Sequence, residues 1–238
     1  MCSSDLMSLT GAPVPAAPVS GDVPMAPVLP QDAADQLAGN IEGLLRQIAS
    51  SGNKNIELQV SSPQGSQFTD LEKLFLSVQA DLSSARIQAF GQWLRRPDIH
   101  PLNCGVFALR DFLKAHGQDV SLEQLSISTL AVDILSDIIR PDDAKLKTSL
   151  FAIDRVARAY RLNHKVIRVA PEDVFSLPVP FISSVGSEHF VTVTRVDEEH
   201  VTYLDIGSRQ TVSRQEFVDQ ASGFVVIADH PAGLNASY

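Results

Sequence analysis

The hydrophobic positions in the first part of the chain follow helical spacing. Apolar side chains recur every three or four residues from Asp32 to Ser50, and this segment ends in Ser-Ser-Gly, which predicts one amphipathic helix followed by a break. A second stripe of this kind predicts a helix from Asp70 to about Gln92, and the run from Asn55 to Val60 favours a short strand. We therefore expect a helical N-terminal extension over residues 31–97.

Three further helices are predicted in the middle of the chain, each from a residue that can cap or end it. The apolar stripe that starts at Cys104 closes at Gly117, a residue suited to the left-handed position after a helix. Ser121 can cap the next helix, and Thr148 or Ser149 can cap the one after it.

From Lys165 onward the pattern changes to short β-branched and aromatic runs separated by Pro, Asp, Glu and Gly. This pattern predicts a series of strands, with one helix between Ser213 and Gln220. Helices that precede a mostly antiparallel sheet make an α+β architecture. The predicted strands are KVIRV, PFISSV, HFVTVTRV, HVTYLD and GFVVIAD.

Composition and charge narrow the class of protein. The chain has 238 residues, 44% of them apolar, which is enough to bury a core. Its net charge of -9 argues against nucleic acid as a partner. We expect a soluble chain with no membrane span, and the absence of a secretion signal favours the cytoplasm. Residues 1–30 are predicted to be a disordered proline-rich linker, and residues 231–238 a tail.

Cys104 is the first candidate for chemistry. The only other cysteine, Cys2, lies in the proline-rich start, so no disulfide framework is indicated and the Cys104 thiol is expected to be free. A helix N-terminus favours the thiolate, and Gly105 would let a carbonyl carbon approach the sulfur. The alternative is an inert apolar cysteine in a core.

A nucleophilic cysteine needs a base and a group that orients the base. His189 opens a predicted strand, and Asp205 ends the strand that follows it, so these two side chains could supply both functions. A histidine and an acid that bond for structural reasons alone are the alternative. The other four histidines are interpreted as surface residues: His116, His164, His200 and His230.

The register of the predicted hairpin decides whether His189 and Asp205 meet. If paired residue numbers sum to 394, chemically similar side chains pair, and His189 lies directly opposite Asp205. A competing register closes on a two-residue Glu198-Glu199 turn, pairs Val196 with Val201, and turns Asp205 to the opposite face. We predict the first register.

These residues stand in a familiar order. The runs NCGVFALRDFLKAHGQDVSLEQL and HFVTVTRVDEEHVTYLD resemble segments of the bacteriocin-processing, or double-glycine leader, cysteine peptidases, and the resemblance extends from about Asp98 to Asp229. That papain-like family often forms the N-terminal domain of peptide-exporting ABC transporters. The resemblance implies a papain-like peptidase domain over residues 98–230, with Cys104 as nucleophile, His189 as general base and acid, and Asp205 orienting His189. It implies no cofactor and no metal ion.

The sequence departs from the family in two places. The family usually has a glutamine six residues before the cysteine to stabilise the oxyanion, whereas this chain has Asp98, whose negative charge would repel it. The backbone N–H of Cys104, with a donor from His100 or Asn103, could replace the glutamine. Ile206 stands where the family tends to have proline, which affects the turn.

Two functions follow. The first is a cysteine peptidase that works through a thioester acyl-enzyme, with a peptide or protein substrate that could carry a Gly-Gly site, as in leader-peptide processing. The second is a catalytically weak or inactive peptidase-like domain that binds a peptide or a neighbouring domain. In either case an exporter or a larger parent polypeptide is a possible partner.

Overall fold

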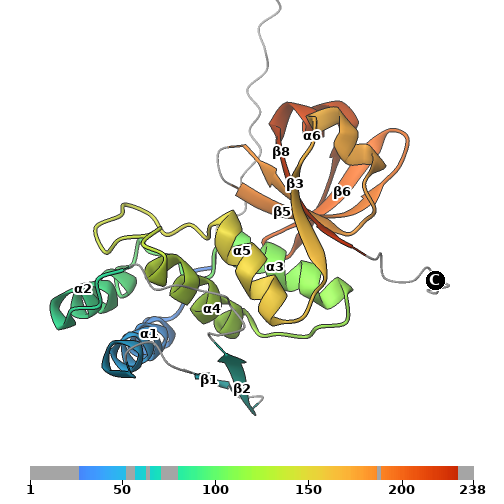
Figure 1. The fold of residues 1–238 in the computed structure, drawn as a ribbon. Coiled ribbons are helices and arrows are strands. Elements are labelled where there is room, and N and C mark those ends of the chain that lie inside the picture. Colours follow the sequence, from blue (N-terminus) through green and yellow to red (C-terminus); the bar gives the residue numbers. More distant parts are fainter. Residues whose placement is uncertain (1–26, 52–56, 63–64, 71–79, 187–188, 230–238) are drawn as a thin grey trace, which may run out of the picture.

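The computed structural model describes residues 27–51, 57–62, 65–70, 80–186 and 189–229. Helices come first along the chain and a sheet follows, so the predicted α+β architecture is confirmed (Figure 1). Most of the predicted linker at residues 1–30 and the whole predicted tail lie outside the described residues. The helices are α1 (Gln31–Ser51), α2 (Ser84–Leu94), α3 (Cys104–Ala115), α4 (Leu122–Leu135), α5 (Leu150–Ala159), the 3-10 helix η1 (Pro171–Ser176) and α6 (Arg214–Gln220).

Two sheets are present in the described residues. A small hairpin pairs β1 (Glu57–Ser62) with β2 (Gly65–Asp70). The large sheet has six antiparallel strands in the order β3-β8-β4-β5-β6-β7. Its strands are β3 (His164–Arg168), β4 (Phe181–Val185), β5 (His189–Val196), β6 (His200–Asp205), β7 (Ser208–Ser213) and β8 (Ala221–Ala228). The edge strand β7 was not predicted, because its polar sequence SRQTVS does not alternate with apolar residues.

The predicted helix over residues 70–92 is wrong in part. Residues up to Asp70 belong to β2, and α2 begins only at Ser84, while residues 71–79 lie outside the described part. The Asp81 carboxylate accepts a hydrogen bond from the Ser83 N–H at 3.0 Å. Such a local bond to the backbone competes with helical hydrogen bonding and delays the helix start.

Helix α4 is buried on every side and joins two hydrophobic cores. Ile127, Leu130 and Ile134 pack in one core with the apolar faces of α1 and α2. Leu125 and Val132 pack in a second core with α3, α5 and the sheet. Figure 1 shows α4 between these two groups of elements. The N-terminal extension therefore completes its core with a helix of the second half of the chain.

Helix α3, which begins with Cys104, packs directly on strand β5. The hydroxyl of Thr192, which is fully buried, donates a hydrogen bond of 2.9 Å to the carbonyl oxygen of Ala108. This contact joins residues 84 positions apart in the sequence. His189, the first residue of β5, also lies within hydrogen-bonding reach of Cys104, the first residue of α3.

The predicted hairpin register is wrong, and a β-bulge explains the difference. Val196 pairs with Val201, as in the competing register, so the two-residue turn is the one that forms. The register then shifts between Val193 and Arg195, so that Val193 pairs with Tyr203. One extra residue on β5, Thr194, produces this shift, and its hydroxyl donates to the Thr202 carbonyl at 3.3 Å.

The bulge restores the face that the turn alone would reverse. Beyond it the paired numbers sum to 396, an even value, so odd-numbered residues of β5 and β6 share one face. His189 and Asp205 are therefore diagonal neighbours on the same face instead of a directly opposed pair.

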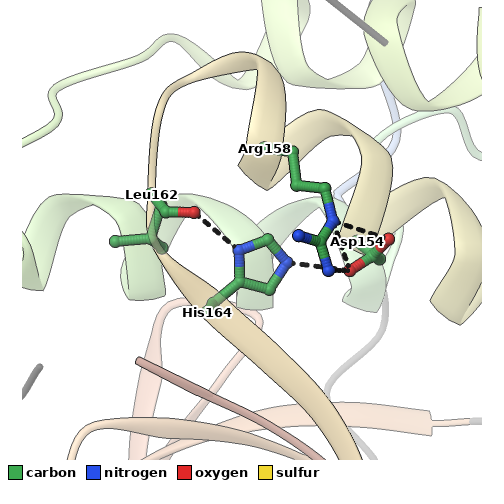
Figure 2. A network of polar contacts seen from close by, with 4 residues as sticks. All are labelled: Asp154, Arg158, Leu162 and His164. Atoms are coloured by element: carbon green, nitrogen blue, oxygen red, sulfur yellow. Dashed lines mark hydrogen bonds and ion pairs between the residues drawn. The ribbon is translucent and has the colours of Figure 1, made fainter. Parts of the chain in front are cut away.

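The prediction that His164 lies on the surface is wrong. Its ring is buried between α5 and β3, where Nδ1 lies 2.8 Å from the carbonyl oxygen of Leu162 and Nε2 lies 3.0 Å from Asp154 Oδ1 (Figure 2). Arg158 also donates to the Asp154 carboxylate, at 2.9 Å. Burial alone would raise the pKa of Asp154, but Arg158 and His164 outweigh it and hold the pKa below its usual value. This network fastens the last helix before the sheet to the first strand of the sheet.

We expect His164→Ala to destabilise the protein by about 2–4 kcal/mol, because it opens a cavity and removes a buried partner of Asp154. His200, an exposed histidine 3.7 Å from Asp197, is the matched control, and His200→Ala should change stability by less than about 1 kcal/mol. Chemical denaturation at neutral pH measures both, and equal losses in the two variants would contradict a structural role for the network.

Candidate active site

Cys104 occupies the first position of α3, as predicted. Asn103 caps the helix in an extended conformation, and its side-chain Oδ1 accepts a hydrogen bond of 3.1 Å from the Gly105 N–H. The Cys104 thiol is free and partly exposed. The sulfur therefore lies at the helix N-terminus, where the unpaired N–H groups and the helix dipole favour an anion.

Gly105 also has a packing role that the sequence did not indicate. A Cβ atom at this position would lie 2.7 Å from the Cβ atom of Thr148, so the missing side chain leaves room for Thr148. The Thr148 hydroxyl donates a hydrogen bond of 2.9 Å to Asn103 Oδ1. The cap of α3 is thus held by a residue from the loop before α5.

His189 and Asp205 are in contact, as predicted. His189 Nε2 lies 2.8 Å from Asp205 Oδ1. The Asp205 side chain is 9% exposed and that of His189 is 25% exposed, so the carboxylate is the more deeply buried member of the pair. With Nε2 engaged by Asp205, Nδ1 is the ring nitrogen left to serve a thiol.

The surroundings of His189 stabilise its protonated form. Hydrogen bonds with Asp205, first, and with Cys104, second, raise the pKa of His189 from 6.5 to about 10, against the opposing effect of burial. At neutral pH the ring is therefore an imidazolium, the form that stabilises a neighbouring thiolate. The raised pKa also contributes folding stability that is complete below about pH 6.5 and is lost as the pH rises through about 10.

The turn after Asp205 differs from the family pattern for a backbone reason. Ile206 has φ +46° and Gly207 has φ +77°, both in the left-handed region. Proline cannot adopt a positive φ, so the turn that this chain forms excludes the family's proline. The Phe107 and Arg110 side chains of α3 lie within 4 Å of the Cβ position of Gly207, so α3 supports the turn that follows Asp205.

The oxyanion candidates lie in different surroundings. Asp98 forms an exposed ion pair with Arg96, which lowers the pKa of Asp98, so its carboxylate has no hydrogen to donate. His100 is partly buried in the loop before α3. Asn103 is buried and its oxygen accepts from two donors, which leaves its amide N–H groups as the possible donors.

A cavity of about 690 Å³ lies beside the cap of α3, where Thr148 lines it. Its wall includes Thr148, which touches the helix cap, and Phe190, the neighbour of His189 in β5. Apolar side chains of Ile138, Leu150 and Phe224 line it together with Lys145. A pocket of this size that combines apolar walls with a few polar groups is typical of ligand sites.

Residues 99–232 match the model of the peptidase C39 family. The chain belongs to the peptidase C39 family. Membership confirms the resemblance found in the sequence and, with the observed architecture, the α+β papain-like fold class. No curated protein matches the chain.

Solved structures similar to this chain include three peptidase domains. One is a double-glycine motif protease from an AMS/PCAT transporter in complex with the leader peptide, with 22% identity, 53% of this chain and 83% of that chain covered, and a TM-score of 0.44. Another is the peptidase domain of Streptococcus ComA, a bi-functional ABC transporter, with 18% identity, 54% and 93% coverage, and a TM-score of 0.44. The third is the peptidase C39-like domain of a toxin secretion ATP-binding protein from Vibrio parahaemolyticus, with 16% identity, 52% and 94% coverage, and a TM-score of 0.41.

Two residues that shape the site were missed as such by sequence reasoning. Thr148 was considered only as a helix cap, a position that Ser149 takes, and Thr192 was considered only as a strand residue. Both act through partners more than 40 positions away, at Asn103 and Ala108. No local pattern identifies such contacts.

No helix in the described ranges is long and apolar enough to cross a membrane.

We expect Asp205→Asn to lower the pKa of His189 from about 10 toward its ordinary value of 6.5, because the substitution removes the hydrogen bond with the largest effect. An NMR titration of the imidazole signals measures the shift directly. His200, which is exposed, serves as the internal reference in the same spectra. A His189 titration that is unchanged in Asp205→Asn would contradict the assigned pairing.

Proposed function

We propose that this chain is a cysteine peptidase in which Cys104 is the nucleophile, His189 the general base and acid, and Asp205 the residue that orients His189. The observation that carries the proposal is the hydrogen bond of 2.8 Å between His189 Nε2 and Asp205, on a ring whose pKa Cys104 also raises. Membership of a peptidase family supports the same reaction class.

The reaction then follows from the positions of these groups. The ring of His189 holds the proton of Cys104, and the thiolate attacks the carbonyl carbon of the scissile bond to form a C–S bond. The imidazolium passes its proton to the leaving amine as the C–N bond breaks, and a thioester remains. Water, deprotonated by His189, hydrolyses the thioester and regenerates Cys104.

The backbone N–H of Cys104 is the proposed donor to the tetrahedral oxyanion. Because Asp98 pairs with Arg96, we assign the second donor to the amide group of Asn103. Its oxygen is engaged by Gly105 and Thr148, so the side chain has one orientation in which the amide N–H groups are available.

The substrate proposed on the family resemblance is a leader peptide with a Gly-Gly site before the scissile bond, presented by an exporter or a larger parent polypeptide. The cavity beside Thr148 and Phe190 is the proposed place for apolar side chains of that peptide. Its size suits side chains beyond the two glycines, which need little space.

A second candidate function is peptide binding without cleavage. The observation that favours it is the exposed carboxylate of Asp98, which stands in place of the family glutamine and is paired with Arg96. Loss of one oxyanion donor typically lowers turnover by about 10²–10³-fold, so slow cleavage is the expectation of the first proposal.

Thiol reactivity separates the two candidates. In a Cys2→Ser background Cys104 is the only thiol, and we expect iodoacetamide at pH 5 to modify it roughly 10- to 100-fold faster than free cysteine, because an ion-paired thiolate persists at that pH. His189→Ala should lose this advantage. If Cys104 reacts no faster than free cysteine at pH 5 and pH 7, binding without cleavage is favoured. If the parent protein cleaves a Gly-Gly peptide and the Cys104→Ala variant does not, binding without cleavage is excluded.

The cavity can be tested with two phenylalanines in similar settings. Phe224 lines the cavity, is 41% exposed and lies under Arg168, whereas Phe151 is outside the cavity lining, 38% exposed and under Arg155. We expect Phe224→Ala to raise KM or the Kd for the peptide by roughly 5- to 30-fold, through lost apolar contact, and Phe151→Ala to leave both unchanged. Equal effects in the two variants would place the peptide elsewhere.

A further inference from the structure

Thr148 stands where the cavity and the cap of the nucleophile helix meet. It is buried, it lines the cavity, and its Cβ atom lies 2.7 Å from the position that a Cβ of Gly105 would take. Its hydroxyl donates to Asn103 Oδ1 at 2.9 Å. One side chain therefore touches both residues that flank Cys104.

The hydrogen bond from Thr148 determines how Asn103 is oriented. Asn103 Oδ1 accepts from the Gly105 N–H and from Thr148, so its carbonyl end points into the helix cap. Without the Thr148 hydroxyl, Asn103 Oδ1 would accept only the hydrogen bond from the Gly105 N–H. The amide plane of the Asn103 side chain could then rotate. The direction of the amide N–H groups beside Cys104 thus depends on Thr148.

Thr148 is itself held through the next residue. Asp133, a buried carboxylate of α4, accepts hydrogen bonds from the backbone N–H of Ser149 at 3.0 Å and from the Ser149 hydroxyl. Burial raises the pKa of Asp133 to about 6, which leaves it ionised at neutral pH and able to accept both bonds. The same helix fixes the loop before Cys104, because the Ser126 hydroxyl donates to the Pro101 carbonyl at 2.9 Å.

We propose that Thr148 is a positioning residue for the nucleophile: held by Asp133 through Ser149, it sets the orientation of Asn103 and thereby the reactive geometry of Cys104. The proposal rests on the proposed function, since it assigns Thr148 a role in the reactivity of Cys104. The proposal also means that a peptide in the cavity contacts Thr148, the side chain that sets the reactive geometry of Cys104.

The test compares substitutions at Thr148 and at a second buried threonine in the Cys2→Ser background. Thr148→Val keeps the shape and removes the hydroxyl, and Thr148→Ser keeps the hydroxyl. The matched control is Thr129→Val, because Thr129 is equally buried but donates only within α4, to the carbonyls of Leu125 and Ser126. Thermal unfolding shows how far each variant is destabilised.

We expect Thr148→Val to slow both the alkylation of Cys104 by iodoacetamide and kcat about tenfold, with KM nearly unchanged, as the loss of one orienting hydrogen bond would do. Thr148→Ser should recover the rate to within about twofold. Thr129→Val should lose similar stability and keep the rate. If Thr148→Val does not fold, Thr148→Ala, which also lacks the hydroxyl but is smaller, replaces it in the comparison.

The outcomes distinguish this inference from the proposed function. An activated Cys104 in the parent protein, together with equal alkylation rates in Thr148→Val and Thr129→Val, would overturn the positioning role alone. A parent Cys104 no more reactive than free cysteine would overturn the proposed function and this role with it. A rate that falls in Thr148→Val but does not recover in Thr148→Ser would assign the effect to packing and also overturn the role.

Discussion

The hydrogen bond from the Thr192 hydroxyl to the Ala108 carbonyl joins the helix that carries Cys104 to the strand that begins with His189. The cysteine and the histidine are 85 positions apart in the sequence, and each lies at the end of its own element. Two element ends can meet only if the elements pack with one register and one direction. The buried contact between α3 and β5 provides this constraint, and the remaining features of the site refine it.

The arrangement of His189 and Asp205 depends on two local irregularities. A two-residue turn closes the hairpin in a register that would turn Asp205 to the face opposite His189. The bulge at Thr194 shifts the register by one residue and returns Asp205 to the face of His189. The left-handed residues Ile206 and Gly207 then end β6 directly after Asp205, where α3 packs against the turn. A left-handed isoleucine is costly, by roughly 1–3 kcal/mol. The fold tolerates this cost directly after Asp205, where β6 ends.

Helix α4 connects the N-terminal extension to the candidate site. On one side it completes the core of α1 and α2, and on the other it holds the loop before α3 through Ser126 and the loop before α5 through Asp133. The segment that matches the peptidase C39 family begins at Ile99, so α1 and α2 lie outside it. The extension therefore supports the site from a distance, by fixing the helix from which both loops are held.

The sequence alone determined most of the elements, because helical spacing, caps and β-branched runs are local signals. Cys104 at a helix start, Ser121 as a cap, and the strands before and after His189 were all predicted from such signals, and Ser149 was one of two predicted caps for α5. The order of the motifs along the sequence was also sufficient to indicate the family. The contact of His189 with Asp205 was predicted too, although from a register that the hairpin does not adopt.

Tertiary structure alone decided how these residues are held. The bulge at Thr194 depends on competition between the turn and the packing of a whole sheet face, which no short window of sequence contains. The buried positions of His164 and Thr148 depend on partners brought together by folding, so neither polar residue gave a local sign of burial. Local propensity can name an element and its ends, but only the packing of distant elements fixes which side chains meet.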